Sequence, residues 1–326
     1  MATTTMTMAK ALNAGLRKAM EDNPKVLLMG EDIGKLGGVF RITDGLQKDF
    51  GEDRVIDAPL AESAIVGTAV GLAVRGYRTV VEIQFDGFVY PAFDQIVSQV
   101  AKLHTRTDGV YTMGLVIRLP FQGGIGAIEH HSESPEAYFA HTAGLRVVSC
   151  STPHDAYWMI QQSIAFDDPI IFCEPKCRYW EKGEVDLDAP GLGLFDAVVR
   201  RAGTDVTMVA YGAQVKTALR AAEAAQGEGV SIEVVDARGV APLDVETIAG
   251  SLERTGRLVV VQEAPETASI GSEIVATLTE RCFYSMRAPG IRVSGYHVPY
   301  PPTKIEEDYR PTVDRVLDAV DRAMEY

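Results

Sequence analysis

Short, continuous apolar runs alternate along the chain with stretches whose apolar residues have the spacing of one helical face. The first helix is predicted where Met8, Leu12, Leu16 and Met20 share a face, ahead of the helix-ending pair at residues 23–24. The runs that predict buried strands are residues 26–29, 79–83, 114–119, 145–149, 170–173, 206–210, 232–235 and 258–261. Further helices are predicted at residues 61–74, 90–103, 153–166, 215–225, 245–252, 271–282 and 313–324. Strands that alternate with helices predict an α/β fold, with parallel sheets covered on both faces.

The alternation stops once, between residues 179 and 194, where glycine and proline stand among acidic residues. We interpret residues 181–194 as a linker between two domains, because such residues interrupt regular structure. The predicted domains are residues 1–180 and 195–326. Two domains also suit a chain of 326 residues, which is longer than one compact core usually needs.

Composition and charge narrow the class of protein. Hydrophobic residues make up 46% of the chain, as in soluble globular enzymes. The formal net charge of −14 disfavours nucleic acid and anionic membranes as partners. The first residues lack the basic and apolar regions of a signal peptide, and the four cysteines lack zinc-site spacing. We therefore expect a soluble, cytoplasmic protein with reduced thiols.

Three polar segments follow predicted strands. They are Gly30-Glu31-Asp32, the segment from Gln84 to Phe88, and Gly123-Gly124-Ile125-Gly126, which leads to His131. Ligands of open parallel sheets bind beyond the carboxyl ends of the strands. A glutamate, an aromatic ring and a histidine are therefore expected at one rim of the first domain.

Glu62 and His131 are the two candidates for acid–base chemistry. Glu62 begins an unusually apolar helix, so its carboxyl group is expected to be shielded from water and suited to proton exchange. By itself, an acidic residue at the positive end of a helix is more often structural. His131 follows a glycine-rich loop that we expect to be flexible, and it acts either as an acid–base group or only in ordering that loop.

Motifs of several other enzyme classes are missing from the sequence. No Gly-x-Gly-x-x-Gly opens a helix after a strand, no Walker A sequence is present, and no Gly-x-Ser-x-Gly elbow occurs. These absences argue against dinucleotide binding by a Rossmann domain, nucleotide hydrolysis and serine hydrolase chemistry.

An ordered set of short motifs resembles the beta subunits of thiamine-diphosphate-dependent 2-oxo acid dehydrogenases. The motifs cover nearly the whole chain, and their order makes the resemblance specific although each motif alone is weak. They include Gly30-Glu31-Asp32, Pro59-Leu60-Ala61-Glu62, Gln84-Phe85, Phe93-Asp94-Gln95, Ile117-Arg118, His131-Ser132-Glu133-Ser134-Pro135-Glu136, Glu174-Pro175-Lys176, Asp236-Ala237-Arg238 and Gln262-Glu263-Ala264.

The resemblance implies a pyrimidine-binding thiamine-diphosphate domain followed by a transketolase C-terminal-like domain. It also implies a separate alpha subunit, because the family's Gly-Asp-Gly motif for Mg²⁺ does not occur here. The expected assembly is an alpha2beta2 heterotetramer that shares thiamine diphosphate across its interface. Its expected partner is the dihydrolipoyl acyltransferase core of a multienzyme complex, which receives the acyl group on lipoamide.

The resemblance also assigns roles to residues of the predicted rim. Glu62 matches the carboxyl group that hydrogen-bonds the pyrimidine ring nitrogen, and Phe88 matches the ring that stacks on the pyrimidine. His131 matches a histidine that takes part in acyl transfer. The other positions expected to line the cofactor pocket are Glu31, Leu60 and Gln84.

A potassium site is a further expectation from the resemblance. Its positions correspond to Gly114, Leu115, Ser163, Phe166 and Asp168. The chain departs from the family at Phe166, where a ligand side chain is lost, and at Ala58, where the family often has threonine.

The expected substrates are branched-chain 2-oxo acids, because residues 134–141 and 295–301 resemble enzymes of that type. Pyruvate is the alternative substrate. An alternative of another class is a non-catalytic assembly subunit that docks the acyltransferase core. The presence of Glu62, Phe88 and His131 favours a catalytic subunit over a scaffold.

Overall fold

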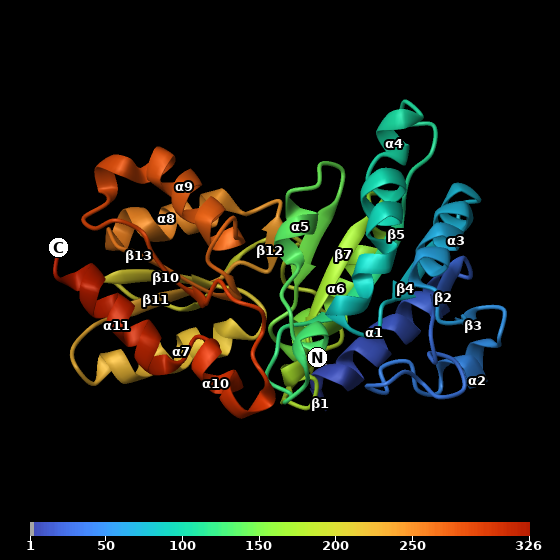
Figure 1. Cartoon of the computed structure of the whole chain (residues 1–326), viewed down its shortest axis with the longest axis horizontal. Helices are drawn as coiled ribbons and strands as arrows, with labels where there is room; N and C mark the ends of the chain where they lie inside the picture. Colours follow the sequence, from blue (N-terminus) through green and yellow to red (C-terminus); the bar gives the residue numbers. More distant parts are fainter. Residues whose placement is uncertain (1–2) are drawn as a thin grey trace. The chain divides into compact units, whose positions relative to one another are not determined.

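The computed structural model describes residues 3–326, which form two compact units (Figure 1). The first unit consists of the chain up to Phe121 together with Tyr138–Leu194. The second consists of Gln122–Ala137 and Phe195–Tyr326. The division after Leu194 lies where the sequence predicts the second domain to begin. The segment Gln122–Ala137 was instead expected in the first domain.

Six parallel strands form the sheet of the first unit, in the order β6-β7-β5-β4-β2-β3. Every strand of this sheet except β3 matches a predicted apolar run. Most of the strands are buried on both faces, as parallel strands require. Their bounds are β2 (Val26–Gly30), β3 (Val55–Asp57), β4 (Arg78–Glu82), β5 (Leu115–Phe121), β6 (Arg146–Ser149) and β7 (Ile170–Pro175).

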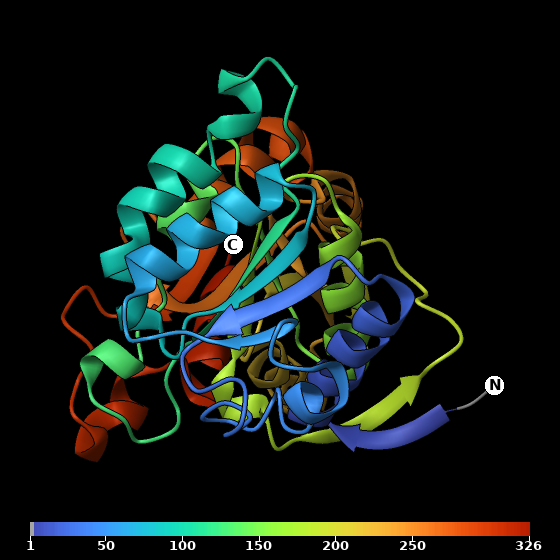
Figure 2. The same cartoon turned by 90° about the vertical axis from the view of Figure 1, so that its right-hand side faces the viewer.

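Helices cover both faces of this sheet (Figure 2). On one face α1 (Met8–Asp22) packs against α6 (Pro153–Ala165), and on the other α3 (Glu62–Val74) packs against the π-helix η2 (Gln95–Val100). Thr7 caps α1 by accepting a hydrogen bond from the Lys10 amide. The observed ends of α1, α3 and α6 lie within two residues of the ends predicted from the sequence.

The helix predicted at residues 90–103 is three separate pieces. A 3₁₀-helix η1 (Asp86–Ala92) precedes η2, and the short α4 (Leu103–Arg106) follows it. Pro91 lies inside η1 and has no amide hydrogen to donate, which breaks a regular α-helical pattern at that point. The apolar spacing is thus satisfied without one continuous α-helix.

The segment predicted to be a linker is partly a strand. Within it β8 (Lys182–Asp186) pairs antiparallel with β1 (Thr3–Thr7) and belongs to the first unit. Most residues of β1 are exposed, so the pair is held by backbone hydrogen bonds rather than by a buried apolar face. A strand of this kind leaves no apolar alternation in the sequence by which to find it.

The second unit has its own five-stranded sheet, in the order β14-β13-β10-β11-β9, with only β9 antiparallel. Helices α8 and α9 pack together on one face, and α7 and α11 pack together on the other (Figure 1). The strands are β9 (Val198–Arg201), β10 (Val206–Ala210), β11 (Ile232–Asp236), β13 (Leu258–Pro265) and β14 (Ile291–Gly295). The helices are α7 (Gln214–Gln226), α8 (Val245–Thr255), α9 (Ile270–Cys282) and α11 (Val313–Met324).

Short elements complete the second unit. They are η3 (Glu129–His131), the first two residues of α5 (Glu136–Ala140), β12 (Gly239–Ala241), η5 (Phe283–Ser285), η6 (Thr303–Ile305) and α10 (Glu306–Tyr309). In the first unit the remaining short elements are α2 (Leu46–Phe50) and η4 (Lys176–Arg178).

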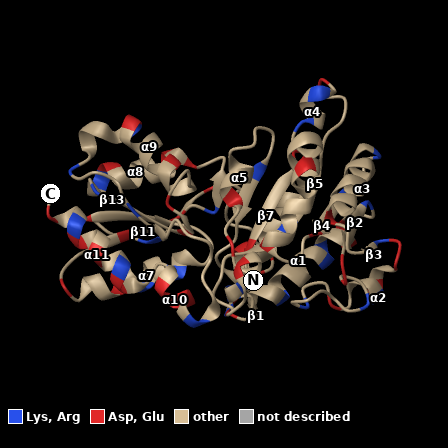
Figure 3. Cartoon of the chain, in the orientation of Figure 1, with Lys and Arg blue, Asp and Glu red and all other residues tan. Residues whose placement is uncertain are grey.

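Charged side chains of both signs are interspersed along the helices (Figure 3). All four cysteines are free thiols, as the sequence predicts. No helix within residues 3–326 combines the length and apolar character that a membrane crossing requires.

Candidate active site

The carboxyl ends of β2, β3 and β4 form one edge of the first unit's sheet. Gly30, the last residue of β2, lies opposite Asp57 of β3 and opposite Glu82 of β4 in the parallel register. The residues that follow these three strands therefore leave the sheet side by side. They carry Glu31, Leu60, Glu62 and Gln84, four of the predicted site residues.

Glu31 and Glu62 lie close enough for their charges to interact. The pKa of Glu31 is raised, mainly because the group is partly buried, and further by the negative charges of Asp32 and Glu62. Gln84 joins them, since its side-chain amide donates a hydrogen bond of 3.4 Å to the Glu31 carbonyl oxygen. The first unit therefore brings together three polar residues that the sequence places 22 to 53 positions apart.

Glu62 is the first residue of α3 and is buried, with 9% of its surface exposed. The positive end of the helix favours a negative charge at this position. Ala61 precedes it in a non-helical conformation and caps the helix without a side-chain hydrogen bond. A shielded carboxyl group with a second carboxyl group nearby is an arrangement found at functional sites.

Phe88 is half-buried in the turn η1, which follows β4. Its ring meets the Phe85 ring edge to face at 6.0 Å, and Phe85 meets Phe40 in the same way at 5.4 Å. Leu60 differs from its neighbours because 71% of its surface is exposed.

A buried ion network supports this edge of the sheet. The Arg118 guanidinium in β5 makes two hydrogen bonds to the Glu174 carboxylate, of 2.6 and 2.8 Å, and one to Glu82. Tyr179 donates a further hydrogen bond to Glu174. Burial raises the pKa of Glu82, while the positive charge of Arg118 opposes that shift. Arg118 and Glu174 stand out in the sequence only as parts of family motifs, and no motif singles out Glu82 or Tyr179, so the sequence gives no sign that these residues meet.

A second buried ion pair holds the turn that carries Phe88. The Lys176 ammonium group lies 2.5 Å from the Asp86 carboxylate, and both side chains are fully buried. Asp86 is the first residue of η1, so the pair fixes that turn to the end of β7. Because an unpaired buried charge is costly, the pair constrains where the turn can lie.

His131 belongs to the second unit, at the end of η3. Its backbone amide donates to the Ile128 carbonyl at 3.0 Å, and the next residue, Ser132, is fully buried. The loop from Gln122 closes on itself, since the Gln122 amide donates to the Glu133 carbonyl at 2.9 Å. The six predicted site residues outside the potassium set are thus divided between the units, with His131 alone in the second.

His130 does not point away from His131, although adjacent side chains often point in different directions. The two rings are in contact, with centroids 4.5 Å apart and planes at 70°. The other side of His130 pairs with Glu129 at 3.2 Å. A 3₁₀ turn brings successive side chains closer in direction than an extended strand would, so His130 is a neighbour of His131 rather than an independent residue.

The potassium positions surround the end of α6. The Phe166 carbonyl accepts a 2.6 Å hydrogen bond from Arg78, whose side chain lies against Gly114. The Ser163 hydroxyl is buried and has no hydrogen-bond partner within residues 3–326, whereas the Asp168 carboxylate is shared by a histidine and an arginine. Leu115 begins β5. The buried Ser163 hydroxyl is an oxygen that a cation can use as a ligand, but the Arg78 guanidinium already supplies a positive charge beside Phe166.

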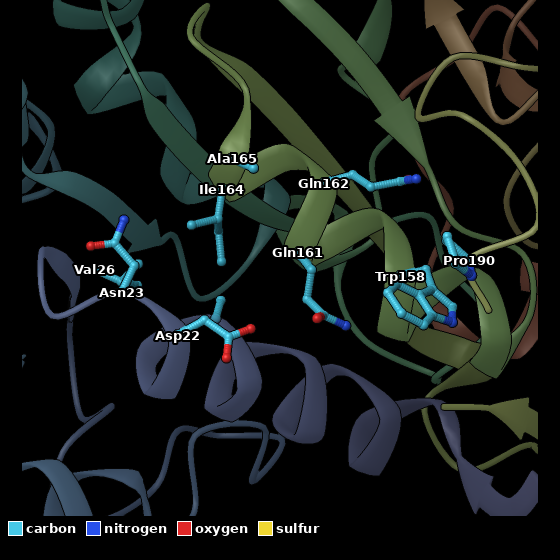
Figure 4. A pocket seen from close by; sticks show the side chains of 10 residues that line it. Asp22, Asn23, Val26, Trp158, Gln161, Gln162, Ile164, Ala165 and Pro190 are labelled. Carbon is cyan, nitrogen blue, oxygen red and sulfur yellow. The ribbon is translucent and has the colours of Figure 1, made fainter. Parts of the chain in front are cut away.

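Hollows on the surface of the first unit include one beside the site and one between two helices. The first, of about 240 Å³, is lined mainly by apolar residues on both sides of Pro59 and along α3, including Ala61, Ala64 and Ile65. The other, of about 320 Å³, lies between α1 and α6, where Trp158 and Gln161 face Asp22 and Asn23 (Figure 4). It shares no lining residue with the candidate site.

Comparison with protein families agrees with the boundary near Leu194 but places Gln122–Ala137, which belongs to the second compact unit, within the first domain. The transketolase pyrimidine-binding domain matches residues 4–180, and the transketolase C-terminal domain matches residues 196–316. Together the two matches cover most of the sequence.

Curated relatives extend over nearly the full chain. It is 59% identical to the pyruvate dehydrogenase E1 component subunit beta of Leifsonia xyli subsp. xyli, over 98% of this chain and 95% of that one. It is 51% identical to the 3-methyl-2-oxobutanoate dehydrogenase subunit beta of Mycobacterium tuberculosis, over 99% of this chain and 93% of that one. A solved split-gene transketolase, described as an inactive beta4 tetramer, shares the fold with a TM-score of 0.80 at 21% identity, over 98% of both chains.

Proposed function

Because the chain belongs to the family of 2-oxo acid dehydrogenase E1 beta subunits, we propose that it acts with an alpha subunit in the oxidative decarboxylation of branched-chain 2-oxo acids. The acyl group passes to lipoamide on the acyltransferase core. This family is thiamine-dependent, and its members carry the transketolase-type pyrimidine-binding domain found here.

The observation that carries the proposal is the buried Glu62 carboxyl group, which shares the strand-end edge with Glu31 and Gln84. These residues fit the pyrimidine half of thiamine diphosphate. Glu62 hydrogen-bonds the ring nitrogen and holds the proton there, and Phe88 stacks on the ring. When bound, the cofactor supplies the carbon nucleophile that attacks the 2-oxo group.

The diphosphate half is assigned to the alpha subunit. Within residues 3–326 no three His, Cys, Asp or Glu side chains gather as a metal site, and the sequence has no Gly-Asp-Gly motif. The exposed Leu60 beside the site gives the partner an apolar surface to cover. We therefore assign Mg²⁺ to the alpha subunit and the shared cofactor to an alpha2beta2 assembly in the cytoplasm.

His131 is proposed to act in the second half of the reaction. Opening of a lipoyl disulfide releases a thiolate, and an imidazolium group can protonate it. The alternative, that His131 only orders its loop, predicts equal losses in both halves of the reaction when the residue is replaced.

The experiment that tests the function is coexpression with an alpha subunit, followed by decarboxylation assays on a panel of 2-oxo acids. We expect higher kcat/KM for branched-chain acids than for pyruvate, as residues 134–141 indicate. A larger pocket gains about 0.8 kcal/mol per buried methylene, whereas a pyruvate pocket excludes the branched chains. A clear preference for pyruvate reverses the substrate assignment.

Pyruvate is the second candidate because the relative with 59% identity is named as a pyruvate dehydrogenase subunit, against 51% for the branched-chain relative. A complex that assembles and docks the acyltransferase core but decarboxylates no 2-oxo acid would instead support the non-catalytic assembly subunit.

Potassium at Gly114, Leu115, Ser163, Phe166 and Asp168 is part of the same proposal, supported by the unsatisfied Ser163 hydroxyl. Melting the assembled complex in KCl and in choline chloride at equal ionic strength tests it. A bound ion raises the melting temperature in KCl only. Equal melting temperatures would mean that no potassium ion binds at these positions and that the Arg78 guanidinium supplies the positive charge there.

A further inference from the structure

The loop that carries His131 is closed by a hydrogen bond between its two ends, and its backbone amides are bound by neighbouring side chains. We call residues 122–133 the histidine loop. Its ends meet through the Gln122 amide and the Glu133 carbonyl, and the Gln122 side chain accepts a 3.0 Å hydrogen bond from the Ala213 amide. All the contacts described below lie within the second unit.

Glu306, at the start of α10, binds the loop backbone with both carboxylate oxygens. Oε1 accepts a 2.5 Å hydrogen bond from the Gly124 amide and a 2.8 Å one from the Tyr300 hydroxyl. Oε2 accepts a 3.1 Å hydrogen bond from the Gly126 amide. The Glu306 side chain is buried, so these hydrogen bonds to a charged group replace the water it would otherwise bind.

Glu263, near the end of β13, binds the same loop one residue earlier. Its Oε1 accepts a 2.5 Å hydrogen bond from the Gly123 amide. Its Oε2 accepts one from the Gln214 side chain at 3.0 Å and faces Arg310 at 3.2 Å. Since Glu263 is fully buried, its carboxylate is held in place by the α7 and β13 framework.

The glycines of this loop permit close packing rather than flexibility. A β-carbon on Gly123 would overlap the Tyr300 hydroxyl, and one on Gly124 would lie 2.6 Å from the Arg310 guanidinium. Gly124 also has a φ of +87°, which favours glycine. Successive backbone amides of this kind form an anion-binding concavity, and here the anions are the chain's own glutamates.

We propose that Glu263 and Glu306, together the carboxylate clamp, are positioning residues for His131. They hold three amides of the histidine loop, and His131 lies five residues beyond the last of them, before the closure at Glu133. The inference rests on the proposed role of His131 in acyl transfer. Neither glutamate touches the reacting groups, and both act through the loop.

The experiment compares graded variants in the full chain assembled with its alpha subunit. Glu306→Gln keeps the side-chain shape but turns one acceptor into a donor that faces the Gly126 amide. Tyr300→Phe removes one of the three donors to Glu306 and leaves the loop amides bound. Glu307→Gln is the matched control, because Glu307 is the exposed neighbour and pairs with Arg310 at 3.3 Å.

Two readouts are measured for each variant. Hydrogen exchange of the 123–126 amides is expected to accelerate by about tenfold or more in Glu306→Gln, less in Tyr300→Phe and not at all in Glu307→Gln. The kcat of acyl transfer to a lipoyl domain is expected to fall by about tenfold in Glu306→Gln, with the KM for that domain unchanged and decarboxylation altered by less than about twofold.

Unchanged amide exchange in Glu306→Gln would overturn the clamp itself. Equal loss of decarboxylation and acyl transfer, or a raised KM alone, would overturn its positioning role. If the wild-type complex transfers no acyl group at all, the proposed function fails, and the exchange data still decide whether the clamp holds the loop. Tyr300→Phe supplies the same comparison if Glu306→Gln does not fold.

Discussion

At the scale of single residues, the surroundings of Glu62 distinguish it from other acidic residues at the start of a helix. An acidic residue at a helix start is usually no more than a favourable charge near the helix dipole. Here the structure buries that carboxyl group and places a second one, Glu31, beside it. The pKa of Glu31 is raised, mainly by its burial and further by the negative charges of Asp32 and Glu62, so Glu31 keeps its proton to higher pH than an isolated glutamate would.

Replacing Glu62 by glutamine is expected to lower decarboxylation by about 100-fold or more, since the amide cannot hold the proton at the pyrimidine ring nitrogen. The fold should persist, because the new side chain has the same shape. Glu52→Gln is the control, as Glu52 is exposed in the same unit. Near-normal decarboxylation by the assembled Glu62→Gln complex would remove Glu62 from the reaction.

His131→Ala is expected to reduce acyl transfer to lipoyl domains by about 10² to 10⁴ while decarboxylation, followed with an artificial electron acceptor, changes little. Because the His130 ring touches His131, His130→Ala should show a smaller loss of the same kind. Replacement of the exposed His297 of the second unit by alanine is the independent control. Similar losses in both assays would mean that His131 only orders its loop.

At the scale of elements, the turn η1 matters because it presents Phe88 and begins with a buried ion pair. The pair of Asp86 and Lys176 joins it to the end of β7. The 3₁₀ geometry of η1 has weaker internal hydrogen bonds than an α-helix, so this side-chain anchor contributes a large share of its stability.

Lys176→Met is therefore expected to destabilise the protein by about 3 to 5 kcal/mol, because it leaves Asp86 charged and buried. Urea denaturation of the variant measures the loss. The double variant Lys176→Met with Asp86→Leu should recover much of the stability but not cofactor affinity, since the anchor of the Phe88 turn is still missing. Lys182→Met, at an exposed position of β8, is the control. Equal stability of Lys176→Met and wild type would contradict the anchoring role.

At the scale of the whole molecule, the proposed function makes the protein one half of a shared site. On that proposal the strand-end residues hold one end of the cofactor, and the exposed Leu60 with the adjoining apolar hollow forms a surface for the alpha subunit. The chain matches two separate domain models, over residues 4–180 and 196–316.

The chain alone is expected to bind thiamine diphosphate weakly, because the diphosphate and its Mg²⁺ have no metal cluster to bind within residues 3–326. Calorimetric titration with cofactor and Mg²⁺, with and without the alpha subunit, measures the difference. Tight Mg²⁺-dependent binding to the isolated chain would show that the site is complete without a partner.

The sequence by itself determined the class of fold and most of its elements. Apolar runs of four to six residues identify β2, β10 and β13, because a buried parallel strand must be apolar on both faces. Helical spacing and capping residues identify α1 and α11 in the same local way. The motif order also identified the family, and with it Glu62 and His131 as candidates, since residues that carry chemistry keep their type and position in such motifs.

Only the tertiary structure decided what depends on contacts between distant residues. β1 and β8 are polar and pair through their backbones, so nothing in their side chains reveals them. The Arg118 network and the carboxylate clamp each join residues more than 30 positions apart, and charge type alone does not show which partners meet. The glycine-rich loop was predicted to be flexible, but it is bound by two buried glutamates. Local spacing records the conformation that a segment prefers, whereas burial and hydrogen-bond partners exist only once the sheets have assembled.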